Sequence, residues 1–200
     1  KQGATGDCWL LAAVNSLSYS PKGRQIIKDS IKYTKDGAIV NFKGLDCFVY
    51  VPYKKIYGAK LSTTFNFGYS SGDDDMKVIE LATEKVIEEY CKGNIVTNKS
   101  AKYTHFYKPK SESLDGNFAE TAWKLLCGQN IELKDYYDID KMMSAKPDLA
   151  NYSFGTKEYK CSKDFWSGKK YREVTDVRTG KKVKLYPRHA YSIKSIDKNG

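Results

Sequence analysis

A cysteine that opens an apolar helix constrains this chain more than any other feature of its sequence. Residues 2–9 read Gln-Gly-Ala-Thr-Gly-Asp-Cys-Trp, and the two glycines give a tight loop just before the thiol. Asp7 is the expected N-cap of a helix that the apolar spacing places at about residues 8–17. The segment 18–21 ends with a proline and stops this helix. The fold must therefore hold a thiol at a helix N-terminus beside a glycine loop.

Cys8 is the candidate nucleophile, and His189 is its candidate general base. A thiol attacks a carbonyl carbon only as a thiolate, and a free cysteine is mostly protonated at neutral pH. A helix N-terminus and an adjacent histidine both lower the pKa of a thiol, so we expect both at Cys8. His189 follows Pro187 and precedes a strand-like run at 190–193, a position that suits proton transfer beside a cleft. Only the fold can join two residues so far apart in sequence.

The neighbouring sequence also suggests roles for three further residues, Gln2, Trp9 and His105. Gln2 is the candidate oxyanion donor, because its side-chain amide and the backbone N–H of Cys8 can stabilise a tetrahedral intermediate. Trp9 is predicted to form a wall of the cleft. His105 stands among aromatic residues in Tyr-Thr-His-Phe-Tyr and is predicted to be an ordinary half-buried side chain.

Beyond the first helix, the hydrophobic spacing predicts a mixed architecture. Two strands at 38–43 and 46–51 are joined by a turn at Gly44. The other expected elements are helices at about 76–91 and 118–126 and strand-like runs at 170–177, 182–186 and 190–196. After Gly128 the chain becomes rich in tyrosine, lysine and short strands. This change indicates a helical lobe that carries the cysteine and a strand-rich lobe that carries the histidine.

The basic composition indicates a solvated lysine-rich surface rather than a nucleic-acid site. The net charge is +10, but acidic residues interrupt the basic ones along the whole chain. The densest stretch, residues 169–184, is typical of an exposed hairpin around Thr179-Gly180. The longest apolar run, at 8–14, is far too short to cross a bilayer. We therefore expect no nucleic-acid partner and no membrane span.

The cysteine count favours a reducing compartment, so we expect a cytoplasmic protein. The chain has five cysteines, an odd number, and no Cys-x-x-Cys pair offers a metal or redox site. One reactive thiol is expected, with the other four buried as small apolar side chains. These four are Cys47, Cys91, Cys127 and Cys161.

Two segments together carry a resemblance to a known family. Residues 2–13 resemble the active-site cysteine segment of calpain-type proteases, and His189-Ala190-Tyr191-Ser192 resembles their histidine segment. Two intermediate segments, 81–85 and 116–128, are also similar to the family. The resemblance thus spans nearly the whole chain, and its first motif is the most specific.

The resemblance implies an α+β, papain-like cysteine endopeptidase core of two lobes. Residues 1–128 would form the helical lobe with the nucleophile Cys8, and residues 129–200 the strand-rich lobe with His189 as general base and then acid. Gln2 would donate to the oxyanion. Peptide bonds of protein or peptide substrates would be hydrolysed through an acyl-thioester.

The sequence also departs from the family pattern. The family's orienting asparagine stands in an Asn-Pro-Trp segment, whereas Asn199 is followed by Gly200. We therefore expect that asparagine and the flanking domains beyond these 200 residues, and weak proteolysis by this segment alone. Arg188 replaces the glycine that is usual before the histidine.

The predicted chemistry needs no cofactor. In animal members of the family calcium is an activator, and Glu84 lies where one ligand is expected. Calcium is therefore a candidate activator here, but no metal ligand is assigned.

Two other functions are compatible with a cysteine followed by a distant histidine. One is acyl transfer of the transglutaminase type, which acts on glutamine side chains. The other is a catalytically silent binding module that has kept the fold. The segment at 2–9 argues against the first, and the presence of both Cys8 and His189 gives no support to the second.

Overall fold

The fold was analysed in a computed structural model of the chain. The structure describes residues 2, 5–64, 69–71, 73–94, 114, 116–117, 119–128, 153–156, 162–163, 170–176 and 179–194. His105, Cys161 and Asn199 lie outside the described residues, and so does the end of the strand expected at 190–196. Helices and strands are both abundant, and this confirms the α+β class.

The expected first helix is present as α1, which runs over Cys8–Ser18. Directly after it, α2 runs over Pro21–Ser30. Ser20 caps α2, because its Oγ accepts a hydrogen bond from the Gly23 N–H at 2.9 Å. Pro21 occupies the first turn of α2, where its missing N–H costs nothing. The proline therefore ends one helix and begins another, which the hydrophobic spacing did not predict.

An antiparallel sheet of three strands follows in the order β1-β2-β3. Its strands are β1 (Ile31–Tyr33), β2 (Gly37–Phe42) and β3 (Cys47–Pro52). Ala38, Val40 and Phe42 alternate inward along β2 and are fully buried. The turn expected at Gly44 is present between β2 and β3. A Cβ at Gly44 would lie 2.0 Å from the Lys124 carbonyl oxygen, so only glycine fits this close approach.

Three helices complete the N-terminal part of the fold: α3 (Tyr53–Thr64), α4 (Asp74–Cys91) and α5 (Ala119–Cys127). Asp73 caps α4 by accepting a hydrogen bond from the Met76 N–H at 3.1 Å. Residues 76–83 of α4 are all buried, and the acidic and basic ones among them need partners inside the protein. Gly128 ends α5 with φ 64°, the left-handed conformation that favours glycine.

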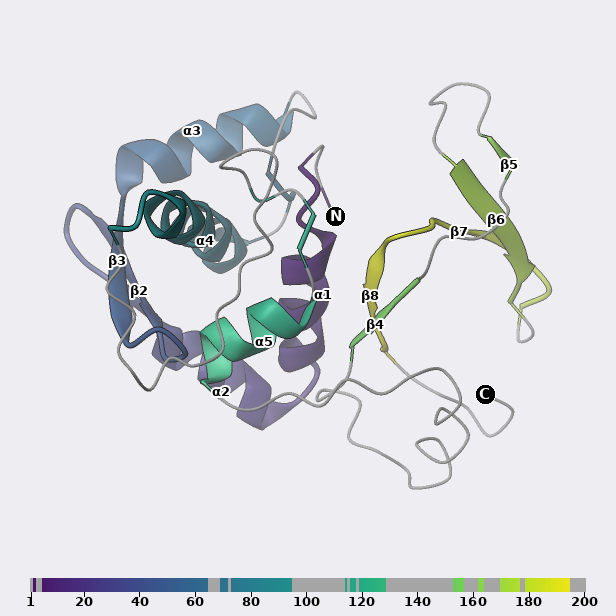
Figure 1. Ribbon diagram of the computed structural model, residues 1–200, viewed down its shortest axis with the longest axis horizontal. Helices are drawn as coiled ribbons and strands as arrows, with labels where there is room; N and C mark the ends of the chain where they lie inside the picture. The colour runs from purple at the N-terminus through teal and green to yellow at the C-terminus, as the bar shows by residue number, and fades with distance from the viewer. Residues whose placement is uncertain are drawn as a thin grey trace.

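The hydrophobic core lies between the sheet and the helices. Among the described residues, every fully buried apolar side chain falls within positions 9–126. Helix α1 packs against α2 and α5 on one side and against a C-terminal strand, β8 (Ala190–Ser192), on another. The helix that begins at Cys8 is therefore the central element of the fold (Figure 1).

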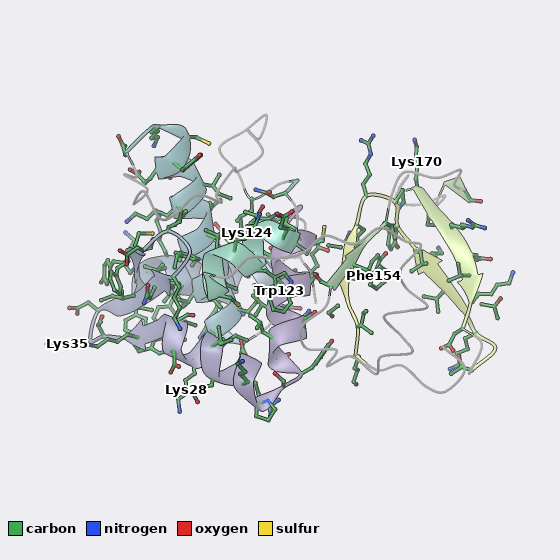
Figure 2. The ribbon with its side chains drawn as sticks, turned by 60° about the horizontal axis from the view of Figure 1, so that its bottom comes forward. Lys28, Lys35, Trp123, Lys124, Phe154 and Lys170 are labelled. Carbon is green, nitrogen blue, oxygen red and sulfur yellow. The ribbon has the colours of Figure 1, made fainter. Side chains whose placement is uncertain are left out.

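The C-terminal strands form two small sheets. In one sheet β4 (Ser153–Gly155) pairs with β8 (Ala190–Ser192), and in the other β5 (Ser162–Lys163), β6 (Lys170–Thr175) and β7 (Lys182–Leu185) pair in order. The β4–β8 pair lies next to the helices, whereas β5–β7 stand apart from them (Figure 1). The Trp123 side chain of α5 reaches β4, and its Nε1 donates to the Ser153 Oγ at 3.1 Å (Figure 2).

The exposed basic hairpin predicted around Thr179-Gly180 is confirmed. β6 and β7 pair in antiparallel register, with Arg172 opposite Leu185 and Thr175 opposite Lys182. Most of their side chains are exposed, and Gly180 has φ 67° in the turn. None of the described helices has the length and apolar character required to cross a bilayer.

Candidate active site

Cys8 stands at the first position of α1, as the sequence predicts. Asp7 occupies the N-cap position, but its side chain makes no capping hydrogen bond. Its backbone carbonyl accepts from the N–H groups of Leu10 and Leu11 at 2.9 and 3.1 Å and so closes the first turn. The expected capping residue is thus correct, but its carboxyl group is used elsewhere.

His189 stands immediately before β8, held by a short hydrogen-bonded link to Thr156. The His189 N–H donates to the Thr156 Oγ1 at 3.0 Å, and the Thr156 N–H donates to the His189 carbonyl at 2.9 Å. The imidazole ring packs edge-on against the Tyr191 ring, with 4.8 Å between centroids. Backbone and ring are therefore both fixed beside β4, at the start of the strand that packs against α1.

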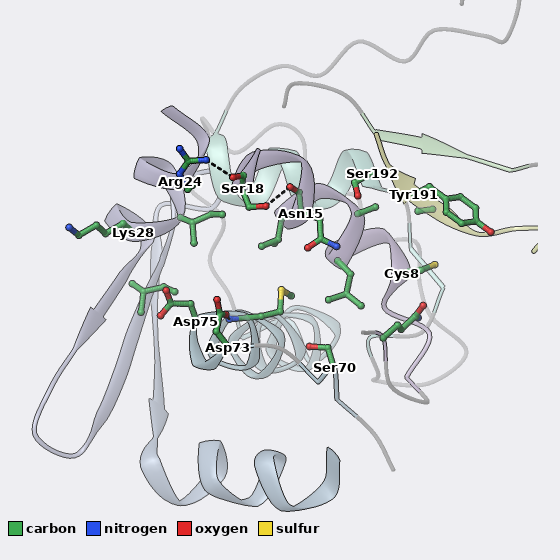
Figure 3. A pocket seen from close by; sticks show the side chains of 18 of the residues that line it. Cys8, Asn15, Ser18, Arg24, Lys28, Ser70, Asp73, Asp75, Tyr191 and Ser192 are labelled. Carbon is green, nitrogen blue, oxygen red and sulfur yellow. Dashed lines mark hydrogen bonds between the residues drawn. The ribbon is translucent and has the colours of Figure 1, made fainter. Parts of the chain in front are cut away.

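The fold brings the three predicted site residues to one cavity. Gln2, Cys8 and His189 all line a cavity of about 840 Å³ between α1, α2, the start of α4 and β8. The backbone N–H of Ala190, the residue after His189, is a hydrogen-bond donor to the Cys8 thiol. Cys8 lies on the side of α1 that faces β8, as Figure 3 shows beside Tyr191.

The expectation that the pKa of Cys8 is lowered is wrong for this structure. Burial raises the pKa of the thiol above its ordinary value. The backbone N–H groups of Ala190 and of the helix start act in the opposite direction but do not outweigh burial. The Cys8 thiol is therefore protonated at neutral pH, and a base is needed to take its proton.

Gln2 lines the same cavity as the thiol, and its amide is already engaged inside the loop. Its Nε2 donates to the Thr5 carbonyl at 2.9 Å and to the Asp7 Oδ1 at 3.2 Å. An amide nitrogen carries two hydrogens, so both are committed in this conformation. In this state Gln2 fixes the loop before Cys8, and donation to an oxyanion requires it to exchange one of these two bonds.

Trp9 does not form a wall of the cleft, contrary to expectation. Its side chain is completely buried, and its Nε1 donates to the Leu114 carbonyl at 2.8 Å. It belongs to the core cluster rather than to the residues that line the cavity. Because α1 begins one residue earlier, Trp9 points from the first turn into the core and anchors the end of the helix that carries the thiol.

A buried pair of carboxyl groups behind Cys8 is a feature that sequence reasoning missed. Asp7 and Glu80 are both completely buried. Burial, followed by hydrogen bonding and charge repulsion with Glu80, raises the pKa of Asp7 from 3.8 to about 9. No spacing rule links the two residues, since they come from a loop and from the middle of α4.

The remaining described thiols are Cys47, Cys91 and Cys127, and none of them forms a disulfide. Cys91 is exposed at the end of α4, so the expectation that all four other thiols are buried is wrong for this one. Cys47 and Cys127 are half-buried, and burial raises the pKa of Cys127 to about 11. Cys91 is therefore the described thiol most open to small reagents.

Calcium stays a candidate activator, and the structure describes the surroundings of Glu84, the residue named for it. The Glu84 carboxylate accepts a hydrogen bond from the Tyr69 hydroxyl at 2.6 Å. Within the part of the chain that the structure describes, no three His, Cys, Asp or Glu side chains are grouped to hold a metal ion. No step of the chemistry below uses calcium.

The cavity continues well beyond the thiol. Figure 3 shows Cys8 at one end and Lys28 at the other, with Asn15 of α1 across from Asp73 and Asp75 at the start of α4. Apolar side chains of α1, α2 and α4 contribute to its lining, namely Leu11, Ile27 and Met76. An elongated cavity with an apolar lining and polar edges suits an extended ligand.

Arg188, directly before His189, has φ 52°, a left-handed conformation that costs about 1 kcal/mol or more for a residue with a Cβ. We therefore expect Arg188→Gly to be more stable than Arg188→Ala by about 1 kcal/mol, because both remove the guanidinium and only the first removes the Cβ. Urea denaturation of the two variants measures the difference. Equal stability, or a more stable alanine variant, contradicts the strain at this position.

No protein-family model, curated protein or solved structure matches the chain.

Proposed function

We propose that this protein is a calpain-like cysteine endopeptidase with a papain-like, two-lobe core. The observation that supports it is the meeting of Gln2, Cys8 and His189, from the two ends of the sequence, around one cavity. A half-buried thiol at the first turn of a helix, with a histidine directly before the strand that packs against this helix, is the arrangement that thiol nucleophiles require. The specific motifs at 2–13 and 189–192 agree with this assignment.

In the proposed reaction His189 takes the proton of the Cys8 thiol, and the sulfur attacks the carbonyl carbon of a peptide bond. The charge that develops on the carbonyl oxygen is stabilised by the Cys8 backbone N–H and by the Gln2 amide. His189 then returns its proton to the amine as the C–N bond breaks, which leaves an acyl-thioester on Cys8. Water, deprotonated by His189, hydrolyses the thioester and restores the thiol.

Because the pKa of Cys8 is raised, the proposed reaction needs His189 to accept the thiol proton. Because the free thiol is protonated at neutral pH, reaction depends on proton transfer to His189 rather than on a standing thiolate. The elongated cavity along α1 supports an extended peptide as the substrate. Loose sequence preference is expected, because apolar side chains such as Leu11, Ile27 and Met76 contribute to the lining and can accept different side chains.

The proposal is tested by labelling with a peptidyl vinyl sulfone, which reaches a thiol through a peptide-binding cleft. We expect this reagent to modify Cys8 in preference to the exposed Cys91, and mass spectrometry of tryptic peptides identifies the site. Cys8→Ala should lose the label, and the matched control Cys91→Ala should keep it. Iodoacetamide, which carries no peptide, reports the reactivity that comes from exposure.

Three outcomes separate this proposal from its alternatives. Modification of Cys91 at the same rate as Cys8 contradicts a peptide-directed nucleophile. Incorporation of an amine into a glutamine substrate, without cleavage of a peptide, indicates acyl transfer instead. Cleavage of a fluorogenic peptide that is lost in Cys8→Ala supports the endopeptidase.

A further inference from the structure

The Asp7–Glu80 pair leaves one buried atom without a hydrogen-bond partner. Within the described residues, the Asp7 Oδ2 is the single buried side-chain oxygen or nitrogen in this condition. Its other oxygen, Oδ1, accepts from the Gln2 amide. A fully buried carboxylate oxygen with no donor is costly, so this atom needs an explanation.

The hydrogen bonds around Glu80 identify where a proton belongs. The Glu80 Oε1 accepts from the Ser70 N–H at 2.9 Å, and its Oε2 accepts from the Ser70 hydroxyl at 2.7 Å. Glu80 thus has a donor on each oxygen, and both oxygens act as acceptors. Asp7 has a donor on one oxygen and Glu80 next to it, and two adjacent buried carboxyl groups do not both ionise. A proton on Asp7 Oδ2 turns the unpartnered atom into a donor.

We propose that Asp7 is protonated on Oδ2 and donates this proton to Glu80, and that Glu80 is thereby a positioning residue for Cys8. The positioning role of the pair rests on the proposed protease function. The protonation of Asp7 does not depend on that function. The chain of bonds runs from Gln2 through Asp7 and Glu80 to Ser70 and ties the loop before the nucleophile to the middle of α4. It also keeps the residue next to Cys8 uncharged when the thiolate forms.

The groups around the pair are few in the described part of the chain. Cys8 follows Asp7 directly, and His189 lines the same cavity as Cys8. On α4, Lys77 lies one turn before Glu80 and Glu84 one turn after it. Tyr69 donates to Glu84 and lies close enough to Glu80 for its own pKa to be raised by that charge. Glu80 is therefore the group that acts directly on Asp7.

A protonated Asp7 makes folding take up a proton. In the unfolded chain its carboxyl is ionised at neutral pH, whereas in the folded chain it stays protonated up to about pH 9. The stability that the proton contributes is complete below the unfolded pKa of 3.8 and is lost as the pH rises toward the folded pKa. Over this window the unfolding equilibrium constant gains about tenfold per pH unit from this one group.

Asp7→Asn tests the proton directly, because an amide keeps the shape of the carboxyl and donates to Glu80 at every pH. We expect the ratio of the unfolding constants of wild type and Asp7→Asn to rise about tenfold per pH unit between about pH 5.5 and 8. Urea denaturation across this range measures the ratio. The matched control is Glu84→Gln, the same kind of change one turn along α4, whose ratio to wild type should lack this slope. Parallel curves for wild type and Asp7→Asn overturn the proposal.

A second pair of variants tests the effect on the thiol. Asp7→Asn and Glu80→Gln each leave one negative charge in the pair, but on Glu80 in the first and on Asp7, beside Cys8, in the second. The midpoint of Cys8 alkylation by iodoacetamide against pH should match wild type in Asp7→Asn and lie about one pH unit higher in Glu80→Gln. The double variant should return it to the wild-type value or below. Identical midpoints in both single variants contradict the positioning role.

These experiments separate the pair from the protease. The pH dependence of the unfolding constants is measured without a substrate, so it tests the proton on Asp7 even if the protein cleaves no peptide. Conversely, the peptidyl reagent could label Cys8 selectively while wild type and Asp7→Asn give parallel stability curves. That result would support the protease proposal and contradict the proton shared by Asp7 and Glu80.

Discussion

Replacing His189 with alanine is expected to lower the rate at which a peptide ester acylates Cys8 by about 10³-fold at neutral pH. The reason is the raised pKa of Cys8: burial keeps the thiol protonated, and the variant lacks the imidazole that is proposed to take its proton. The measurement is a single-turnover acylation followed by intact-mass analysis. It uses a Cys91→Ala background, because the exposed Cys91 would otherwise react as well.

The expected loss is informative only if the variant keeps its fold. The His189 backbone, rather than its ring, makes the hydrogen bonds to Thr156, so the alanine variant retains both. An unchanged urea midpoint is the control for this point. Acylation within tenfold of the parent rate, in a folded variant, contradicts the role of His189 as the base.

Trp9→Ala is expected to cost about 3–5 kcal/mol of unfolding free energy, the largest effect on stability that we predict. The Trp9 side chain is completely buried in the core, and its Nε1 hydrogen bond satisfies the Leu114 carbonyl. Its removal leaves a cavity beneath the first turn of α1 together with an unpaired carbonyl. Thermal or urea denaturation measures the loss.

A matched aromatic control is available on the surface. Phe48 is 71% exposed on β3, so Phe48→Ala should change the unfolding free energy by only about 0.5 kcal/mol. Trp9→Phe keeps most of the apolar volume and should lie between the two alanine variants. A Trp9→Ala variant that is as stable as Phe48→Ala contradicts the place of Trp9 in the core.

Elements with a strong hydrophobic period were predictable from the sequence. The first helix, the β2–β3 hairpin, the helix at 74–91 and the helix at 119–127 all lie within two residues of their expected bounds. Helices α2 and α3 were not predicted, because few of their positions are apolar and no continuous stripe marks them. Their stability depends on packing against α1 and α4, which a local pattern does not contain.

The residues of the candidate site also differ in whether local sequence or tertiary packing identifies them. Cys8, Gln2 and His189 could be found because their residue types and local motifs carry a recognisable chemistry. The Asp7–Glu80 pair could not, because Glu80 differs from the other glutamates of α4 only in what it faces after folding. The direction of the Cys8 pKa was also missed, since a helix start predicts a lower value whereas burial of the folded thiol raises it.

Helix α1 packs against other helices on one side and against β8 on another, and the two contacts differ in how deeply their side chains are buried. Toward α2 and α5 it is anchored by completely buried side chains, whereas β8 meets it through half-buried residues at 190–192. Detaching β8 therefore requires less free energy than melting the helix, as is usual for local opening compared with global unfolding. The fraction of molecules in which β8 is docked on α1, and the free energy of global unfolding, are consequently two separate quantities in this molecule. A molecule that bridges α1 and β8 would increase the assembled fraction by mass action, with no need to strengthen the interior.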